Sequence, residues 1–335
     1  MSVHSKSAIS GVTLTQHISR QQRALRATGE FTAVLAQINL AGKIIARALS
    51  HAGLYSLQGE ALGPQGENMG LFAKETFMKV FSLSPWVSTL VCEGGEPLAA
   101  AASAAGKYIV FVDPLDAASN LDVNGVTGSI FSVQRRLSAG EKATEKDLLQ
   151  KGSEQVAAGY IMYGPSTMLV YTSGSGVNSY KLDTGIGEFL IYQENIRIPD
   201  RGLTYSCNEA HYHDWPEHTR KYIEHLRKRD ARSDKYYSSR HARCLVFNLH
   251  RTLHEGGVCL YPVDTASDKP GGRRRLIYQC NPLAFITEQA GGRATNGTER
   301  ILKIQPESLA QRSPLIVGSS YEVLLYEDFA KGSRA

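Results

Sequence analysis

The sequence predicts an α/β fold, in which short β-rich segments alternate with segments of helical spacing. Runs rich in β-branched and aromatic residues recur between residues 89 and 182, bounded by Gly, Ser, Pro and Asp, and they predict the strands of a sheet. A second set of strands and helices begins near Ile196. At 335 residues, with 42% hydrophobic residues, the chain can bury the large core that this fold requires.

The individual elements follow from hydrophobic periodicity and turn residues. Residues 14–53 show helical spacing, which places one apolar face at Val34, Ile38, Ala41, Ile45 and Leu49. We expect a loop over 58–70, which is rich in glycine and contains a proline, and a helix over 71–80. The predicted strands are 89–92, 108–112, 129–133, 157–163, 168–171 and 179–182, then 205–207, 257–261 and 276–278. Further helices are predicted over 216–228 and 281–290, the latter ended by a glycine pair.

Charge and cysteine usage exclude several classes of protein. The net charge of +5 is modest, and the basic clusters at 220–232 and 273–275 suit phosphate groups better than nucleic acid, although a solvated helix face also explains the first cluster. Five cysteines without CxxC spacing argue against a disulfide framework and structural zinc. Neither a run of about 18 apolar residues nor an apolar signal core in residues 1–20 is present. We therefore expect a cytoplasmic protein that binds neither nucleic acid nor membrane, unless a plastid or mitochondrial leader has been removed.

The most informative segment is 112–122, where an apolar strand ends in an Asp-rich turn. The strand runs directly into Asp113, Asp116 and Asp122. Carboxylates at a strand end, followed by a turn whose backbone N–H groups can hold phosphate, suit Mg²⁺ beside a phosphoryl group. The alternative is a surface loop of turn-forming residues.

Within this segment, DPLDAASNLD resembles the DPLDGSSNID signature of the fructose-1,6-bisphosphatases, a family of metal-dependent sugar phosphatases. The likeness covers nearly the whole chain, in the family's order, through TGEFT, GKY, GYIMYGPSTMLV, GVNSYKLDTGIGEF, CNEAHYHDW, GGVCLYP, RRLIYQCNPLAFITEQAGG and RSPLIVGS. The resemblance implies a five-layered α/β/α/β/α sandwich, with a regulatory domain over 1–195 that carries the metal loop and a sugar-phosphate domain over 196–335. It also implies a homotetramer.

The metal ligands that the resemblance implies are only partly kept. Matching positions are Glu93, Asp113, Leu115, Asp116 and Gln279, with Glu93, Asp113 and Asp116 as the catalytic carboxylates. Gln279 stands where the family has a glutamate, so an acceptor oxygen remains but a negative charge is lost. The family's second glutamate is replaced by Gly94, and Glu96, two residues farther on, is its alternative. We expect a weakened Mg²⁺ site, with Mn²⁺ as a second candidate.

Two further departures concern the catalytic chemistry. The mobile loop is shortened over 67–71, where Gly70 aligns with the family's aspartate, and Ala117 and Ala118 replace a glycine and a serine of the signature. Losing the group that activates water costs roughly 10²–10⁴ in rate. The sequence therefore predicts a very slow or inactive phosphatase. In that case its role would be that of a regulatory paralogue that assembles with an active subunit. The alternative is an active Mg²⁺-dependent fructose-1,6-bisphosphatase or sedoheptulose-1,7-bisphosphatase.

The resemblance implies a sugar-bisphosphate pocket with a partly altered lining. The matching residues are Asp116, Ser119, Asn208, Tyr261 and Arg273, and Arg240, which in the family reaches in from a neighbouring subunit. His211 and His241 stand where the family has tyrosines, and each can donate to phosphate. Tyr212, next to His211, is a candidate to compensate.

The resemblance also implies an AMP site at the start of an N-terminal helix, where N–H groups and the helix dipole attract phosphate. The matching residues are Thr28, Gly29, Glu30, Phe31, Thr32, Lys107, Tyr108 and Arg135. A TGE sequence alone indicates only an ordinary helix cap. Together with the lysine, tyrosine and arginine it predicts AMP binding, so the regulatory site is better kept than the catalytic one.

Overall fold

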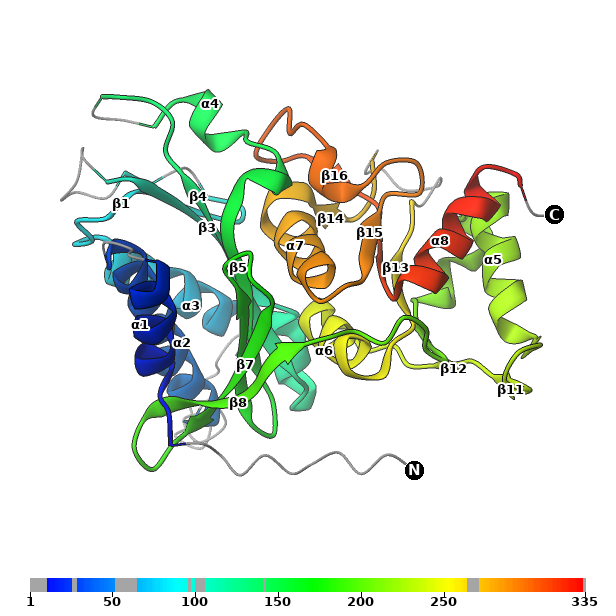
Figure 1. Cartoon of the computed structure of the whole chain (residues 1–335), viewed down its shortest axis with the longest axis horizontal. Helices are drawn as coiled ribbons and strands as arrows, with labels where there is room; N and C mark the ends of the chain where they lie inside the picture. Colours follow the sequence, from blue (N-terminus) through cyan, green and yellow to red (C-terminus); the bar gives the residue numbers. More distant parts are fainter. Residues whose placement is uncertain are drawn as a thin grey trace.

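Alternating layers of helices and sheets make up the fold, as Figure 1 shows. The computed structural model describes residues 11–25, 29–51, 65–95, 98–99, 106–140, 143–263 and 271–333. Three helices cover an eight-stranded sheet, two helices separate it from a five-stranded sheet, and two more cover the far side. The five-layered α/β sandwich expected from the resemblance is therefore confirmed.

The outer helices on the N-terminal side are α1 (Leu14–Leu25), α2 (Glu30–His51) and α3 (Gln65–Phe81). The predicted apolar face of α2 is buried at Val34, Ile38, Ala41 and Ile45. By length and composition α2 is apolar enough to cross a membrane, but this face packs in the core with α3 and the first sheet. The predicted loop over 58–70 is wrong in its described part, because residues 65–70 form the first turns of α3. Burial of Phe77 and Phe81 against the sheet outweighs the low helix propensity of the glycines.

The large sheet has the strand order β2-β1-β3-β4-β5-β6-β7-β8. Its strands are β1 (Val87–Cys92), β2 (Leu98–Ala99), β3 (Tyr108–Asp116), β4 (Thr127–Arg135), β5 (Gln155–Tyr163), β6 (Thr167–Thr172), β7 (Val177–Asp183) and β8 (Glu188–Ile196). Only β1 and β3 run parallel among the described pairs of this sheet. Their carboxyl ends therefore lie side by side, which brings the ends of the segments at 92 and 112 together.

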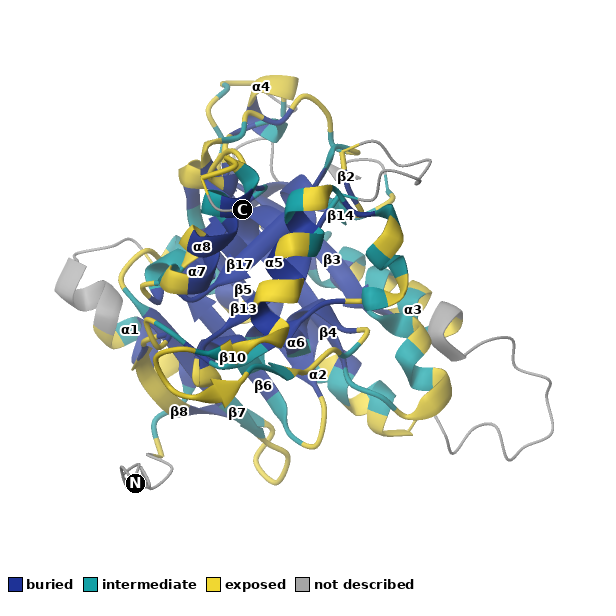
Figure 2. Cartoon of the chain, turned by 90° about the vertical axis from the view of Figure 1, so that its right-hand side faces the viewer, coloured by how far each residue is buried: buried dark blue, intermediate teal, exposed yellow. Residues whose placement is uncertain are grey.

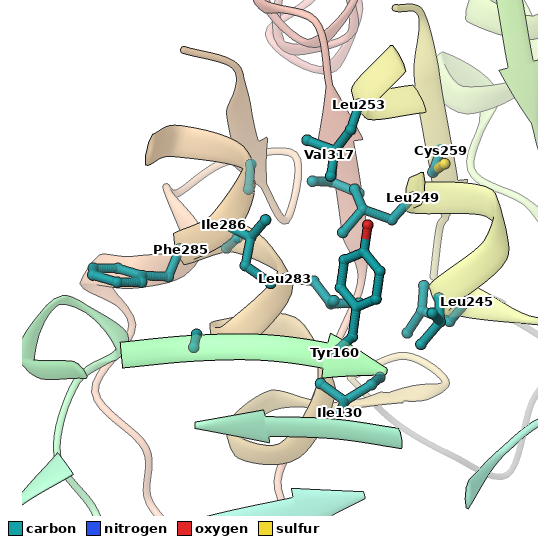
Figure 3. Packing of buried hydrophobic residues seen from close by; sticks show 14 of the residues in the cluster. Ile130, Tyr160, Leu245, Leu249, Leu253, Cys259, Leu283, Phe285, Ile286 and Val317 are labelled. Atoms are coloured by element: carbon teal, nitrogen blue, oxygen red, sulfur yellow. The ribbon is translucent and has the colours of Figure 1, made fainter. Parts of the chain in front are cut away.

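The middle layer consists of α6 (Leu245–Glu255) and α7 (Asn281–Gln289), packed between the two sheets. Figure 3 shows Tyr160 of β5 rising between Leu283 of α7 and Leu245 of α6. The hydroxyl of Tyr160 lies 2.9 Å from Nδ1 of His250. Burial is tolerated here because the phenol has a polar partner.

The second sheet has the order β12-β9-β13-β17-β15. Its strands are β9 (Thr204–Ser206), β12 (Ser238–Ser239), β13 (Val258–Tyr261), β15 (Arg293–Thr295) and β17 (Leu315–Gly318), and its outer face is covered by α5 (Glu217–Arg227) and α8 (Ser320–Ala330). Figure 2 shows α5 in front of this sheet with its exposed residues turned outward. The short elements are α4 (Glu145–Leu148), β10 (Arg229–Asp230), β11 (Lys235–Tyr236), β14 (Arg274–Arg275), β16 (Arg312–Ser313), η2 (Ala118–Val123), η3 (Gly152–Glu154), η4 (Glu209–Asp214), η5 (Leu276–Cys280) and η6 (Ile301–Lys303).

The strand predicted over 276–278 is wrong, because η5 is a turn of π-helix that continues into α7. Every residue of η5 is buried, and its side chains are divided between two cores. Leu276 packs in the middle layer, whereas Ile277 and Tyr278 pack against β1 and β3. An apolar run buried on all sides has no alternation, so its sequence does not distinguish a strand from a buried helix.

Candidate active site

The signature segment ends β3 with two buried carboxylates. Asp113 and Asp116 are 4% and 5% exposed, and Asp116 pairs with Gly128 of β4 at the end of the ladder. Ala117 follows in the left-handed region at φ 60°, where a side chain costs roughly 1–2 kcal/mol. Ala117 therefore adopts a conformation that glycine would adopt at lower cost.

Gln279 of η5 bridges two carboxylates through its amide nitrogen. Nε2 lies 2.8 Å from Oδ2 of Asp113 and 3.5 Å from Oε2 of Glu93, which directly follows β1. Oε1 accepts the backbone N–H of Arg275 at 3.1 Å, so a flipped amide would set its oxygen against the carboxylates and its N–H groups against the Arg275 N–H. The N–H groups of Gln279 thus face the carboxylates.

Protein groups also face two further carboxylate oxygens, one of Glu93 and one of Asp116. Arg275 Nε lies 3.4 Å from Oε1 of Glu93. Oδ2 of Asp116 accepts the Val246 backbone N–H at 3.1 Å and the Cys244 thiol at 3.3 Å. Burial raises the pKa of Asp113, as do the charges of Glu93 and Asp116, and the Gln279 hydrogen bond opposes this only in part.

The site residues do not fit a divalent cation in this arrangement. Mg²⁺ needs several acceptor oxygens turned toward one point, whereas here an amide N–H points between Asp113 and Glu93. Within the described part of the chain, no group of three or more His, Cys, Asp or Glu side chains is placed to hold a metal ion. Leu115, between the aspartates, has its side chain in the core. Glu96 lies outside the described residues.

The segment expected to carry the catalytic loop belongs to a helix instead. Gly70 lies inside α3, and α3 packs against η2 next to the signature. Gly94 follows Glu93 in an exposed turn at φ 69°, with open space where a Cβ would stand.

A pocket of about 770 Å³ opens beside the signature. It is lined by Asp116, Ala117, Ser119, Cys207, Asn208, His211, Trp215, His241, Arg243, Leu260, Tyr261, Pro262, Arg273 and Arg274. The structure thus brings together five of the six residues predicted to hold the sugar bisphosphate. Arg240 is the exception: it is exposed, is absent from the lining, and donates from Nη1 to the Ser239 carbonyl at 3.3 Å.

Sequence reasoning missed Arg243 and Arg274 as pocket residues. The sequence feature that points to Arg274 is the run of three arginines at 273–275. The run predicts phosphate binding, but only Arg273 was assigned to the sugar-bisphosphate pocket. The guanidinium carbon of Arg274 lies 4.3 Å from the centroid of the Tyr261 ring. This stacking places a cation on the pocket wall.

The histidines that replace tyrosines both line the pocket. Nδ1 of His211 lies 3.3 Å from Nη2 of Arg273, and Nδ1 of His241 lies 3.1 Å from the Ser206 hydroxyl. Burial, and then the charge of Arg274, lower the pKa of His241. A neutral His241 at pH 7 still offers one N–H donor. Tyr212 does not line the pocket; its hydroxyl donates to Glu224.

The predicted nucleotide residues converge at the start of α2. Lys107 Nζ lies 2.7 Å from Oε1 of Glu30, and the Phe31 and Tyr108 rings are 6.2 Å apart. Arg135, the β-ladder partner of Tyr108, places its guanidinium carbon 5.7 Å from that ring. Gly29 precedes the helix at φ 80° and Thr32 lies in its first turn, whereas Thr28 lies outside the described residues.

Known proteins resemble this chain in both sequence and architecture. Models of the fructose-1-6-bisphosphatase N-terminal and C-terminal domains match residues 12–194 and 198–331. Proteins named fructose-1,6-bisphosphatase class 1 from Chloroherpeton thalassium and Chlorobium chlorochromatii are 43% and 41% identical over 331 residues, which is 96% of this chain and 94% and 99% of theirs. The holo and apo crystal structures of Leishmania major fructose-1,6-bisphosphatase superpose with TM-scores of 0.87 and 0.86 at 35% and 34% identity, over 96% of this chain and 99% and 100% of theirs. On these grounds the chain belongs to the fructose-1,6-bisphosphatase family.

Proposed function

We propose that this protein binds a sugar bisphosphate, with fructose 1,6-bisphosphate as the first candidate, and hydrolyses it very slowly or not at all. The observation that carries the proposal is the Gln279 amide, which donates to Asp113 at 2.8 Å where the family places a charged ligand. An amide donor satisfies the carboxylate and adds no negative charge to attract a cation. The family's reaction, release of phosphate with fructose 6-phosphate in carbohydrate metabolism, is the activity against which this protein is to be measured.

The pocket supports the binding half of the proposal. Arg243, Arg273 and Arg274 line it, and Asp116 is the only carboxylate among those lining residues that the structure describes. Guanidinium groups match phosphate oxygens in fork geometry, and an excess of positive charge favours a ligand with two phosphate groups.

The start of α2, which lies by the beginning of β3 and not by the pocket at its end, supports a regulatory role. Gly29, Glu30, Lys107, Tyr108 and Arg135 lie together as an AMP site requires. We further propose a homotetramer in the cytoplasm, or a mixed assembly with an active paralogue. In either assembly the exposed Arg240 would be free to enter a neighbouring pocket.

A second candidate function is an active Mg²⁺-dependent phosphatase for fructose 1,6-bisphosphate or sedoheptulose 1,7-bisphosphate. The convergence of Glu93, Asp113 and Gln279 favours it, because the carboxylates expected to be catalytic do meet at one place. Mn²⁺ is the alternative ion.

Phosphate release by the purified protein separates the two candidates. With either bisphosphate and Mg²⁺ or Mn²⁺, we expect turnover at the level of a no-enzyme control. Steady metal-dependent turnover near the roughly 1–10³ s⁻¹ typical of enzymes would overturn the first candidate and establish the second.

A further inference from the structure

Arg274 differs from the arginines on either side of it in the partners it has. Arg275 lies 3.4 Å from Glu93 and donates to the Ala310 carbonyl at 2.5 Å. Arg273 lies 3.3 Å from His211. The buried Nε of Arg274, like that of Arg275, has no hydrogen-bond acceptor among the residues that the structure describes, but Arg274 also has no ion pair there. A largely buried guanidinium group without a carboxylate partner is costly, and a phosphate group in the pocket would supply the missing anion.

The stacking on Tyr261 fixes where this guanidinium points. The hydroxyl of Tyr261 accepts a hydrogen bond from Nδ2 of Asn248 at 2.8 Å, and the ring is 8% exposed, so it is held in place. Arg274 lies 4.3 Å over this ring and lines the pocket together with Asp116, Ala117 and Ser119. The cation is therefore preorganised at the signature end of the pocket.

Asp116 lies near this charge: burial lowers the pKa of Arg274, but the charges of Tyr261 and Asp116 raise it overall. Its Oδ2 accepts the Val246 N–H and the Cys244 thiol, and no hydrogen bond joins it to Arg274 among the described groups. A phosphate group entering at this end meets a guanidinium group that has no ion-pair partner among the described residues, close to the place where the family uses metal ions.

We infer that Arg274 binds the phosphate at the signature end of the pocket, so that a sugar bisphosphate binds without a divalent cation. This rests on the proposed sugar-bisphosphate function. The guanidinium supplies positive charge and N–H donors to the phosphate oxygens. Because Arg274 is permanently charged, this binding does not depend on filling a metal site.

Calorimetric titration with fructose 1,6-bisphosphate and with fructose 6-phosphate, each in EDTA and in excess Mg²⁺, tests the inference. We expect the parent protein to bind the bisphosphate with a Kd that differs by less than about twofold between the two buffers, well below the tenfold that corresponds to ~1.4 kcal/mol. Arg274→Met should weaken the bisphosphate by at least about tenfold and fructose 6-phosphate much less. Arg274→Lys, which keeps the charge but loses the fork, should fall between the two.

Arg251→Met is the matched control. Arg251 also stacks on an aromatic ring, at 4.9 Å from Phe247, but it lies outside the pocket lining. Its bisphosphate affinity should equal that of the parent, and melting curves should show that all three variants are folded.

Three results would overturn the inference. They are bisphosphate binding by the parent only in Mg²⁺, unchanged binding by folded Arg274→Met, and an equal loss of both ligands, which would assign Arg274 to the other phosphate. In each case the proposed function stands. If the folded parent binds the bisphosphate in neither buffer, the proposed function fails as well.

Discussion

The ammonium group of Lys107 lies 2.7 Å from the carboxylate of Glu30, the first residue of α2. The pair joins the helix start to the beginning of β3, where a nucleotide phosphate is expected to bind. An anion that uses Lys107 must therefore compete with Glu30 for the same cation.

AMP should raise the melting temperature of the protein by binding at this helix start. A ligand at ~100 times its Kd adds roughly 2.7 kcal/mol to the free energy of unfolding. Arg135→Ala should remove most of the shift, and Glu30→Gln should enlarge it by releasing Lys107. Lys235→Ala, an exposed change on β11, is the control. No shift with millimolar AMP in either the parent or the control would contradict AMP binding.

Gln279→Glu should create affinity for Mg²⁺ or Mn²⁺. The change replaces the donor facing Asp113 with a third negative group, which also destabilises the metal-free protein by several kcal/mol. Metal should then raise the melting temperature of the variant more than that of the parent. Adding Gly94→Glu should strengthen binding further, although φ 69° at that position costs roughly 1–2 kcal/mol.

Calorimetry with Mn²⁺ measures this gain directly, and Gln305→Glu, at an exposed position, is the matched charge control. Phosphate release should lag behind metal binding, because Gly70 supplies no carboxylate. Equal heats for Gln279→Glu and Gln305→Glu would show that residue 279 is not the missing ligand.

Ala117→Gly should stabilise the protein by about 1 kcal/mol, since glycine adopts the left-handed conformation without the Cβ penalty. Asn124→Gly is a suitable comparison, because Asn124 has a similar φ of 54° but is a residue type that tolerates it. Urea unfolding of both variants measures the difference. A destabilised Ala117→Gly would mean that the methyl group contributes packing that outweighs the strain.

Glu322 should make stability fall as pH rises from about 4.5 to 7. Burial raises the pKa of this fully buried carboxyl group to about 7, against the opposing hydrogen bond from Tyr237 and the charge of Arg201. Between its usual pKa and 7, the folded state holds a proton that the unfolded state has released, so unfolding becomes easier with rising pH, by at most about 3 kcal/mol. Above pH 7 this dependence ends.

Unfolding free energies at pH 5 and pH 8 measure this dependence. Glu322→Gln should change the difference by the amount that this carboxyl group contributes, whereas Glu299→Gln, at an exposed position, should leave it unchanged. Identical pH dependence in the parent and Glu322→Gln would show that the carboxyl group titrates normally in the folded protein.

Most of this fold could be predicted because the apolar strands and the buried face of α2 show a clear hydrophobic pattern in the sequence. It failed at 276–278, where burial on all sides removes the alternation, and at 65–70, where packing of Phe77 and Phe81 outweighs local propensity. The same limit applies to the site. The identity of Gln279 showed that a charge was lost, but only the Arg275 N–H reveals that the amide donates to the carboxylates. The sequence likewise does not show which of the three neighbouring arginines enters the pocket, whereas the contact of Arg274 with the Tyr261 ring does.

Asp116 accepts two hydrogen bonds from the start of α6, so this carboxylate also caps a helix. Cys244 stands at the N-cap of α6 and offers only a weak sulfur acceptor, at 3.5 Å from the Phe247 N–H. Asp116, 130 residues earlier in the chain than Val246, supplies the anion that a helix start favours. A cation that drew Oδ2 of Asp116 toward itself would withdraw the cap from a helix in the layer between the two sheets. Metal ligation and helix initiation are therefore rival uses of one oxygen atom, and in this chain the helix holds it.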